Sequence, residues 1–412
     1  MSESINVAVV GLGRVGLPLA LVFAEHGCRV LGLEVDVARL AALSEGRLPF
    51  IEEGADELLA RHFGRNFHPS GDPAVITQAD VVILTFGTPV DEHMNPAYTQ
   101  LEGVVEGLLP HFRAGQTLVL RSTVAPGTTK YLRRFIEGRT SLKVGTDFFL
   151  AFCPERIAEG RAIPEIGEIP QIVGALDPES GRRAAALFSR IAPQCLPADA
   201  TAAELAKLFC NMYRYIDFAI GNEFMIIAMQ HNANIYDIVD LVNRDYKRAG
   251  LKLPGLTGGP CLYKDGFFLV DRVPFADLIS TAWKINETVP GFLIERIKRE
   301  RDLPGLTAVI LGLAFKRNID DNRNSLAYKA RKIFAAEGCR TVLHDPHLAP
   351  GDVEAVIRAG DIVFVAMNHD VYRDLGRARF RALLKDDAIV CDIWNLFGRG
   401  DIIYAKRDLP LE

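Results

Sequence analysis

The chain has 412 residues, of which 49% are hydrophobic and 24% charged, and its formal net charge is −5. This length exceeds one ordinary core and indicates two or three domains. The acidic balance argues against a nucleic-acid-binding protein, and no apolar run reaches the roughly 18 residues of a membrane span. No signal peptide is predicted. Seven scattered cysteines without a CxxC pair favour free thiols in a reducing cytoplasm.

The first half of the chain alternates predicted strands and helices. An apolar strand is predicted at 5–10, a helix at 15–26 and a second strand at 29–33. Further buried strands are predicted at 80–84 and 117–120. Strands that alternate with helices indicate a parallel sheet with helices on both of its faces.

The middle of the chain has a different pattern. Residues 202–230 contain no proline and keep apolar residues at three-and-four spacing, which predicts a long helix that is apolar on more than one side. Such a helix typically links two domains or packs against a second subunit. A glycine-rich stretch at 254–261 interrupts the helical pattern.

The α/β pattern returns after Pro304 and repeats that of the first half, with strand-like segments at 307–311, 359–365 and 387–392. The turn at 312–316 lacks a glycine fingerprint. We therefore predict an α/β protein with two Rossmann-like, doubly wound parallel sheets joined by a central helical domain. The expected domains are a Rossmann-like domain at 1–198, a helical domain at 199–300 and a second Rossmann-like domain at 301–412.

Gly11, Gly13 and Gly16 follow the first predicted strand and open a predicted helix. In a dinucleotide fingerprint the first glycine allows the tight turn, the second lets the backbone approach the pyrophosphate, and the third allows close helix–strand packing. The helix N-terminus then faces the phosphates. The alternative is a tight turn that holds no ligand.

An acidic residue, Glu34, closes the next predicted strand about 20 residues after the glycines, the spacing of the fingerprint. Its carboxylate would accept hydrogen bonds from the adenosine ribose and repel a 2′-phosphate, so NAD is favoured over NADP. Arg39 argues weakly the other way, and Asp36 is the alternative ribose ligand. The segment 85–89, with Thr88, and the Ser122-Thr123 pair end strands where ligands bind in such sheets, unless they are ordinary turns.

Cys261 lies at the end of the glycine-rich stretch, three residues before Lys264 and four before Asp265. A cysteine beside flexible backbone and a lysine is a candidate nucleophile. The alternative is a cysteine that is merely buried.

At this point the chain resembles the nucleotide-sugar 6-dehydrogenases, the UDP-glucose/GDP-mannose dehydrogenase family, over essentially its whole length. The matching stretches are Gly11–Pro18, Arg121–Thr123, Cys153–Glu159, Glu204–Lys207 with Asn211, Asn222–Glu223, Gly258–Cys261 with Lys264 and Asp265, and Gly312–Lys316 with Arg323.

The resemblance implies oxidation of the sugar's C6 alcohol to a carboxylate, with two hydrides passed to two NAD+. Cys261 would capture the aldehyde as a thiohemiacetal, and the second oxidation would give a thioester that water hydrolyses. Lys207 would stabilise negative charge at the C6 oxygen, Asn211 would donate to that oxygen, and Asp265 would hold a water molecule or tune Lys207.

The hydrolytic water is implied to be held by Thr123 and activated by a carboxylate. Glu155 and Glu159 both match family carboxylates, and Glu155 is favoured because it follows Pro154 in the tighter part of the motif.

The fingerprint and the resemblance together imply two sets of ligand contacts. The resemblance further implies that the first domain binds NAD, that the domain at 301–412 binds the nucleotide of the substrate, and that no metal is needed. The cofactor set is Gly11, Gly13, Arg14, Val15, Gly16, Glu34, Arg39, Thr88, Thr123 and Arg323. The substrate set is Glu155, Arg156, Glu159, Lys207, Asn211, Arg248, Gly258 and Lys316. His344 and His347, which flank Asp345-Pro346, are interpreted as part of a strand-end turn. At least a homodimer, formed through the long helix, is expected.

Arg156 favours the N-acetylhexosamine branch, because a Phe-Leu pair tends to follow the glutamate in the UDP-glucose and GDP-mannose branches. The expected substrate is a UDP-N-acetylhexosamine or UDP-hexose, with TDP-glucose or another nucleotide sugar of an antibiotic or polysaccharide pathway as the alternative. Two other hypotheses stay open. One is a two-electron dehydrogenase without a covalent step, and the other is a non-catalytic NAD or nucleotide-sugar sensor.

Overall fold

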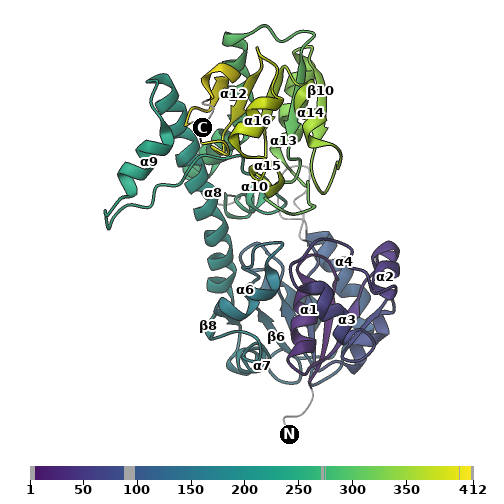
Figure 1. Ribbon diagram of the computed structural model, residues 1–412. Coiled ribbons are helices and arrows are strands. Elements are labelled where there is room, and N and C mark those ends of the chain that lie inside the picture. The colour runs from purple at the N-terminus through teal and green to yellow at the C-terminus, as the bar shows by residue number, and fades with distance from the viewer. Residues whose placement is uncertain (1–4, 88–97, 271–272, 274, 399, 410–412) are drawn as a thin grey trace. The chain divides into compact units, whose positions relative to one another are not determined.

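The chain forms two compact units in the computed structural model (Figure 1). The first comprises 1–210 with 267–272, and the second comprises 211–266 with 273–412. The residues that the structure describes are 5–87, 98–270, 273, 275–398 and 400–409.

The described part of the first unit contains an eight-stranded sheet in the order β3-β2-β1-β4-β5-β6-β7-β8. Neighbouring strands are parallel except β6 and β7, which are antiparallel. The strands are β1 (Asn6–Val10), β2 (Arg29–Leu33), β3 (Phe67–Ser70), β4 (Val81–Leu84), β5 (Thr117–Leu120), β6 (Phe149–Phe152), β7 (Gln171–Ala175) and β8 (Cys195–Asp199).

Helices cover both faces of this sheet, as buried parallel strands require. Side chains of α1, α3 and α7 share one hydrophobic core with the sheet, and those of α4 and α5 share another. The helices are α1 (Gly16–Glu25), α2 (Val37–Ser44), α3 (Ala55–His62), α4 (Tyr98–Leu108), α5 (Thr128–Glu137), α6 (Ala162–Glu168), α7 (Pro178–Phe188), α11 (Phe267–Val270) and the first part of α8 (Ala200–Gln230).

The second unit contains, among its described residues, a five-stranded sheet in the order β10-β9-β11-β12-β13. Only β13 is antiparallel to its neighbour. The strands are β9 (Thr307–Leu311), β10 (Arg340–His344), β11 (Ile362–Val365), β12 (Ile389–Asp392) and β13 (Ile403–Ala405). The helices are α9 (Ile235–Asn243), α10 (Leu262–Asp265), α12 (Asp277–Glu300), α13 (Leu326–Ala336), α14 (Val353–Ala359), α15 (Asp370–Arg373), α16 (Gly376–Leu383) and the rest of α8.

The helices of the middle region share a core with this second sheet. Met225 of α8, Val239 of α9 and Leu293 of α12 belong to the same buried cluster as Ile310 of β9 and Phe364 of β11. The side chains meet because each helix buries its apolar stripe against the sheet. The second unit is therefore one packed body rather than a sheet with loosely attached helices.

The predicted fold class is confirmed: two sheets with mainly parallel strands are joined through a helical region. The strands predicted at 29–33, 117–120 and 307–311 coincide with β2, β5 and β9, and the long helix begins at Ala200. The domain boundaries at 198 and 300 stay predictions. Within the described residues, no helix is both long enough and apolar enough to cross a membrane.

Candidate active site

The glycine turn after β1 has the shape of a cradle for a dinucleotide. A Cβ on Gly16 would lie 1.8 Å from the carbonyl oxygen of Gly11, so no side chain fits there. A Cβ on Gly13 would meet no atom within 4 Å, which leaves open space beside the turn. Thr85 closes the base of the turn, since its hydroxyl donates to the Gly11 carbonyl at 2.6 Å. A pyrophosphate can approach the backbone at Gly13, so these residues fit the expected cofactor.

Glu34 lies at the end of β2 and is buried against this turn. Its carboxylate accepts hydrogen bonds from the backbone N–H groups of Leu12 (2.9 Å), Val35 (2.8 Å) and Asp36 (2.9 Å). It also accepts from the Arg39 guanidinium at 2.6 Å. Burial raises the pKa of Glu34, but these hydrogen bonds outweigh burial and lower it overall. An ionised carboxylate at this place suits ribose hydroxyls and opposes a 2′-phosphate.

Carboxylates also hold the backbone of the segment 156–162. Glu155 accepts from the N–H groups of Arg156 (2.6 Å) and Ile157 (2.8 Å), and Glu165 from that of Ala158 (2.6 Å). Glu52 accepts from the N–H groups of Gly160 (3.0 Å) and Ala162 (2.6 Å). The segment carries Glu159, which pairs with Arg14 of the glycine turn at 3.0 Å. Val15 caps α1 just beyond Arg14. The segment is therefore held in one conformation beside the cofactor turn.

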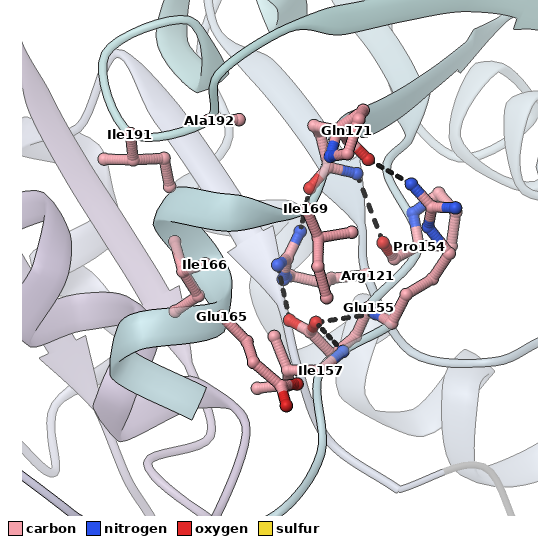
Figure 2. Close-up of a pocket in the computed structure, with 12 residues that line it drawn as sticks. Arg121, Pro154, Glu155, Ile157, Glu165, Ile166, Ile169, Gln171, Ile191 and Ala192 are labelled. Atoms are coloured by element: carbon pink, nitrogen blue, oxygen red, sulfur yellow. Dashed lines mark hydrogen bonds and ion pairs between the residues drawn. The ribbon is translucent and has the colours of Figure 1, made fainter. Parts of the chain in front are cut away.

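Figure 2 shows a small pocket in which Arg121 contacts both the Glu155 carboxylate and the Gln171 side chain. The Arg121 guanidinium forms an ion pair with Glu155 and donates to the side-chain oxygen of Gln171 at 2.8 Å and to the carbonyl of Cys153 at 3.2 Å. Gln171 in turn donates to the Pro154 carbonyl at 3.2 Å. Both oxygens of Glu155 are thus engaged in fixing the Cys153–Ile157 segment.

Lys207 lies on α8 and is buried, with 9% of its surface exposed, so it is not a solvated surface lysine. Glu204, one turn earlier, fixes this part of α8 against α5. Its carboxylate accepts from the N–H groups of Gly127 (2.6 Å) and Thr129 (2.7 Å) at the start of α5. Burial raises the pKa of Glu204 despite these hydrogen bonds. Thr123 follows β5 ahead of this helix, and its neighbour Ser122 donates its hydroxyl to the Phe86 carbonyl.

In the second unit, Cys261 ends a glycine loop and caps the short helix α10, and its side chain is exposed. The loop lies directly on other backbone and ring atoms. A Cβ on Gly258 would be 2.5 Å from the carbonyl oxygen of Asn324, and one on Gly259 would be 2.8 Å from the Phe315 ring. Because only glycine allows this approach, the loop fixes the place of the Cys261 thiol.

Asp265 is fully buried four residues after Cys261. Its two carboxylate oxygens accept from the amide of Asn211 at 2.6 Å and from the Lys264 ammonium at 2.9 Å. Asn211 is itself buried on α8. The structure therefore brings together two of the predicted catalytic residues, Asn211 and Asp265, with Lys264 as a third member.

The remaining predicted substrate and cofactor residues lie on loops. Arg323 is held by two hydrogen bonds from its Nε to the Asp321 carboxylate (3.0 and 2.8 Å). Lys316 lies half-buried in the long loop after β9, and Arg248 is packed over the Tyr246 ring. Arg156 donates to the Pro170 carbonyl. Thr88 lies outside the described residues. Among the described residues, no three histidine, cysteine, aspartate or glutamate side chains lie together as a metal ion would need.

Sequence reasoning did not single out Arg121, Gln171, Glu52 or Glu204 as parts of the site, although Arg121 and Glu204 stand in the matched motifs. One signal was present for Arg121: an arginine directly after a buried apolar strand needs a buried acceptor. The others have no local signal, because their partners lie far away in the chain.

Models of one protein family match three successive parts of the chain. They are the NAD-binding domain (5–192), the central domain (201–288) and the UDP-binding domain (309–399) of the UDP-glucose/GDP-mannose dehydrogenase family. The chain belongs to this family. It is an NAD-dependent oxidoreductase of the nucleotide-sugar dehydrogenase type, and its C-terminal sheet belongs to the nucleotide-sugar-binding part.

Individual relatives agree with the family models. A UDP-N-acetyl-D-mannosamine dehydrogenase of Pyrococcus horikoshii is 29% identical over 96% of this chain and 100% of the relative. One from Campylobacter jejuni is 30% identical over 83% of this chain and 86% of the relative. The solved structure of UDP-D-ManNAc dehydrogenase from Pyrococcus horikoshii has a TM-score of 0.87 and 28% identity, over 92% of this chain and 93% of that one.

Proposed function

We propose that this member of the family catalyses a four-electron oxidation, in which the C6 alcohol of a nucleotide sugar becomes a carboxylate through a covalent adduct on Cys261. The observation that carries the proposal is the exposed Cys261 thiol at the end of a glycine loop that leaves no room for a single extra carbon atom. Because the loop holds the Cys261 nucleophile in place, little conformational entropy is lost when the thiol attacks an aldehyde.

The proposed reaction consists of two oxidations followed by a hydrolysis. Two NAD+ molecules, held one after the other at the glycine turn, would supply the hydride acceptors for the two oxidations. The Cys261 thiolate adds to the C6 aldehyde to form a thiohemiacetal, and loss of the second hydride leaves a thioester. Water then attacks the thioester carbon, the C–S bond breaks, and the carboxylate and the free thiol are formed. The thiol therefore retains the substrate between the two oxidations.

Lys207 is proposed to stabilise negative charge on the C6 oxygen, with Asn211 as a hydrogen-bond donor to it. The burial of Lys207 supports this role, because a charge in a site shielded from water acts more strongly than one in solvent. The second N–H of the Asn211 amide is available for such a contact in principle, since an amide carries two and one is given to Asp265. Asp265 thus orients Asn211.

Thr123 and one of the two carboxylates, Glu155 or Glu159, are proposed to handle the hydrolytic water. The Glu155 carboxylate is engaged by an ion pair with Arg121 and by two backbone N–H groups. This geometry supports an orienting role for Glu155 rather than proton abstraction.

The proposed substrate is a UDP-N-acetylhexosamine. The names of the relatives support it, as does Arg156 in the Pro154-Glu155-Arg156 motif. A UDP-hexose or TDP-glucose is the alternative. The seven free cysteines support a reducing compartment such as the cytoplasm.

A homodimer through the long helix is also proposed. Tyr213, Phe224 and Ile227 of α8 expose 70%, 43% and 46% of their surface, and Leu241 of α9 exposes 69%. Large apolar side chains gathered along one helix typically mark an interface. We expect Phe224→Glu to yield monomers in sedimentation velocity at concentrations where the wild type sediments as a dimer. Identical sedimentation of both proteins would contradict the proposal.

The decisive experiment is turnover with UDP-N-acetylmannosamine, UDP-N-acetylglucosamine and UDP-glucose, with NADH followed by absorbance and the product by mass. Two NADH per uronate are expected with one of these sugars. Cys261→Ser should lower uronate formation by at least roughly 100-fold, because its hydroxyl is a far weaker nucleophile than a thiolate. Cys210→Ser is the matched control, since Cys210 is also exposed but stands outside the loop.

Two results would contradict the proposal in different ways. Uronate formed by Cys261→Ser at the wild-type rate with two NADH would exclude the covalent step and leave a dehydrogenase without a thioester. Absence of NADH with every UDP- and TDP-sugar tested would favour a non-catalytic binding protein.

A further inference from the structure

The second sheet has a topological switch point between β9 and β11. From β9 the chain passes to β10 on one side of the sheet, and from β11 it passes to β12 on the other. In open α/β sheets, ligands bind beyond the carboxyl ends of the strands at such a point. Two segments border it here, the long loop at 312–325 after β9 and the short one at 366–369 after β11. The long loop contains Lys316.

Two side chains near this switch point, Asp345 after β10 and His369 after β11, are fully buried, with 0% of their surface exposed. His369 Nε2 is 3.2 Å from Asp345 Oδ2. The other ring nitrogen, Nδ1, accepts a hydrogen bond from the backbone N–H of Asn318 at 3.0 Å. Because Nδ1 is an acceptor, the proton of the neutral ring is on Nε2 and faces the carboxylate.

The pair holds the long loop on both sides of Lys316. Before Lys316, Asp345 accepts from the backbone N–H groups of Leu313 (2.6 Å) and Ala314 (3.0 Å). After Lys316, His369 accepts from that of Asn318, whose φ of 58° is in the left-handed region that few residues adopt without support.

Asp370 adds further contacts where the loop is attached at Asn318. Its backbone N–H donates to the Asn318 side chain at 3.1 Å, and its carboxylate accepts from the side chains of Asn318 and Arg317. The loop is thus fastened to the segment after β11 at the residues that follow Lys316. Neither Asp345 nor His369 is exposed, so neither is placed to touch a ligand itself.

We propose that Asp345 and His369 are positioning residues, which hold the backbone around Lys316 in the conformation that receives the phosphates of the nucleotide sugar. The inference rests on the proposed function, because it requires the nucleotide part of the substrate to bind at this edge of the second sheet. The buried Asp345 charge is stabilised by its donors, two of which are further N–H groups, those of His347 (2.9 Å) and Leu348 (3.1 Å). The carboxylate therefore organises the backbone of the loop from below.

The test is calorimetric titration of the full-length protein with UDP and, separately, with NAD+. His369→Ala should weaken UDP binding at least tenfold and leave the NAD+ affinity unchanged. In turnover it should raise the KM for the nucleotide sugar and leave kcat within twofold. His369→Asn should bind UDP within threefold of the wild type, since its amide oxygen replaces Nδ1 as acceptor for the Asn318 N–H. This variant also keeps the test valid if His369→Ala does not fold.

His344→Ala is the matched control. His344 is buried in the same region, but its ring nitrogens contact the Tyr372 hydroxyl (3.0 Å) and the Gly351 carbonyl (3.3 Å), not the loop. It should lose thermal stability and keep its UDP affinity. The inference is overturned if His369→Ala binds UDP as the wild type does, or if His344→Ala weakens UDP equally. If the wild type binds neither UDP nor any UDP-sugar, it is the proposed function that fails.

Discussion

The two Rossmann-like sheets begin with the same turn. In each, the first strand ends in a glycine with a positive φ, +93° for Gly11 and +87° for Gly312. The N–H of each glycine donates, at 2.8 Å, to the last carbonyl of the neighbouring strand, that of Leu33 or His344. The backbone path is therefore repeated, although only the first turn has the glycine fingerprint.

What differs is the carboxylate that closes the turn and the helix that follows it. Glu34 accepts one N–H of the first turn, that of Leu12, whereas Asp345 accepts two of the second turn, those of Leu313 and Ala314. The first turn leads directly into α1 at Gly16, and the second leads through a long loop before α13 begins. The first turn thus leads to a helix N-terminus that is suited to face phosphates. The second leads to a loop that contains basic residues and is held in place by hydrogen bonds.

The largest expected effects come from substitutions of two glycines in the first turn, of which one should change NAD+ affinity and the other stability. Gly13→Ala should fold with wild-type stability, because its Cβ meets no atom within 4 Å. It should nevertheless weaken NAD+ binding by roughly 100-fold, about 2.7 kcal/mol, because the methyl group occupies the space that the pyrophosphate needs. Gly16→Ala should be destabilised by about 3 kcal/mol, since its Cβ would overlap the Gly11 carbonyl. Calorimetry with NAD+ and urea unfolding measure the two effects.

Gly312→Ala is the corresponding change in the second turn. Its Cβ would lie 2.5 Å from the Met367 Cβ and its φ is positive, so it should lose stability. Its NAD+ affinity should not change. A Gly13→Ala protein with wild-type NAD+ affinity would contradict the assignment of the first turn as the cofactor site, and weaker NAD+ binding by Gly312→Ala would remove the contrast between the turns.

The repeated turn also shows which features the sequence predicts. β2, β5 and β9 were predicted at their observed bounds because each is a short apolar run between turn residues, a pattern that depends on neighbours along the chain. The glycine turn and the Cys261 loop were found for the same reason. His344 and His347 are interpreted from the sequence as part of a strand-end turn, but nothing in that interpretation predicts the contact of Asp345 with His369.

The missed contacts share one physical cause. His369 meets Asp345 because β10 and β11 lie on either side of β9, and Glu204 meets Gly127 because α8 packs on α5. Such a pair is determined by which strand ends and helices become neighbours in the folded chain. Because an unpaired carboxylate in the core costs several kcal/mol, a buried carboxylate must be paired with a hydrogen-bond donor. Residue type and spacing along the chain do not contain this information.

A smaller effect compares the two carboxylates directly. Asp345→Asn should lower the free energy of unfolding by about 3 kcal/mol, because the amide cannot accept from all four backbone N–H groups and at least one remains unsatisfied. Glu34→Gln should cost less, about 1.5 kcal/mol, because its Arg39 partner is 31% exposed and can turn to solvent. Urea unfolding at neutral pH measures both, and equal losses would contradict the ranking.

At acid pH, Asp345→Asn should lower the free energy of unfolding by less than it does at neutral pH. Burial raises the pKa of Asp345, but His369 and the N–H groups of His347 and Leu313 outweigh burial and hold the pKa well below its ordinary value of 3.8. A carboxyl group whose pKa is lowered on folding contributes stability that is fully present above the unfolded value and is lost as the pH falls toward the folded one. The gap between the wild type and Asp345→Asn should therefore be constant from about pH 7 to about pH 5 and narrow from there to about pH 2. A stability difference that does not narrow would mean that the ionised Asp345 carboxylate does not hold the second turn. The two turns would then resemble each other in backbone path alone.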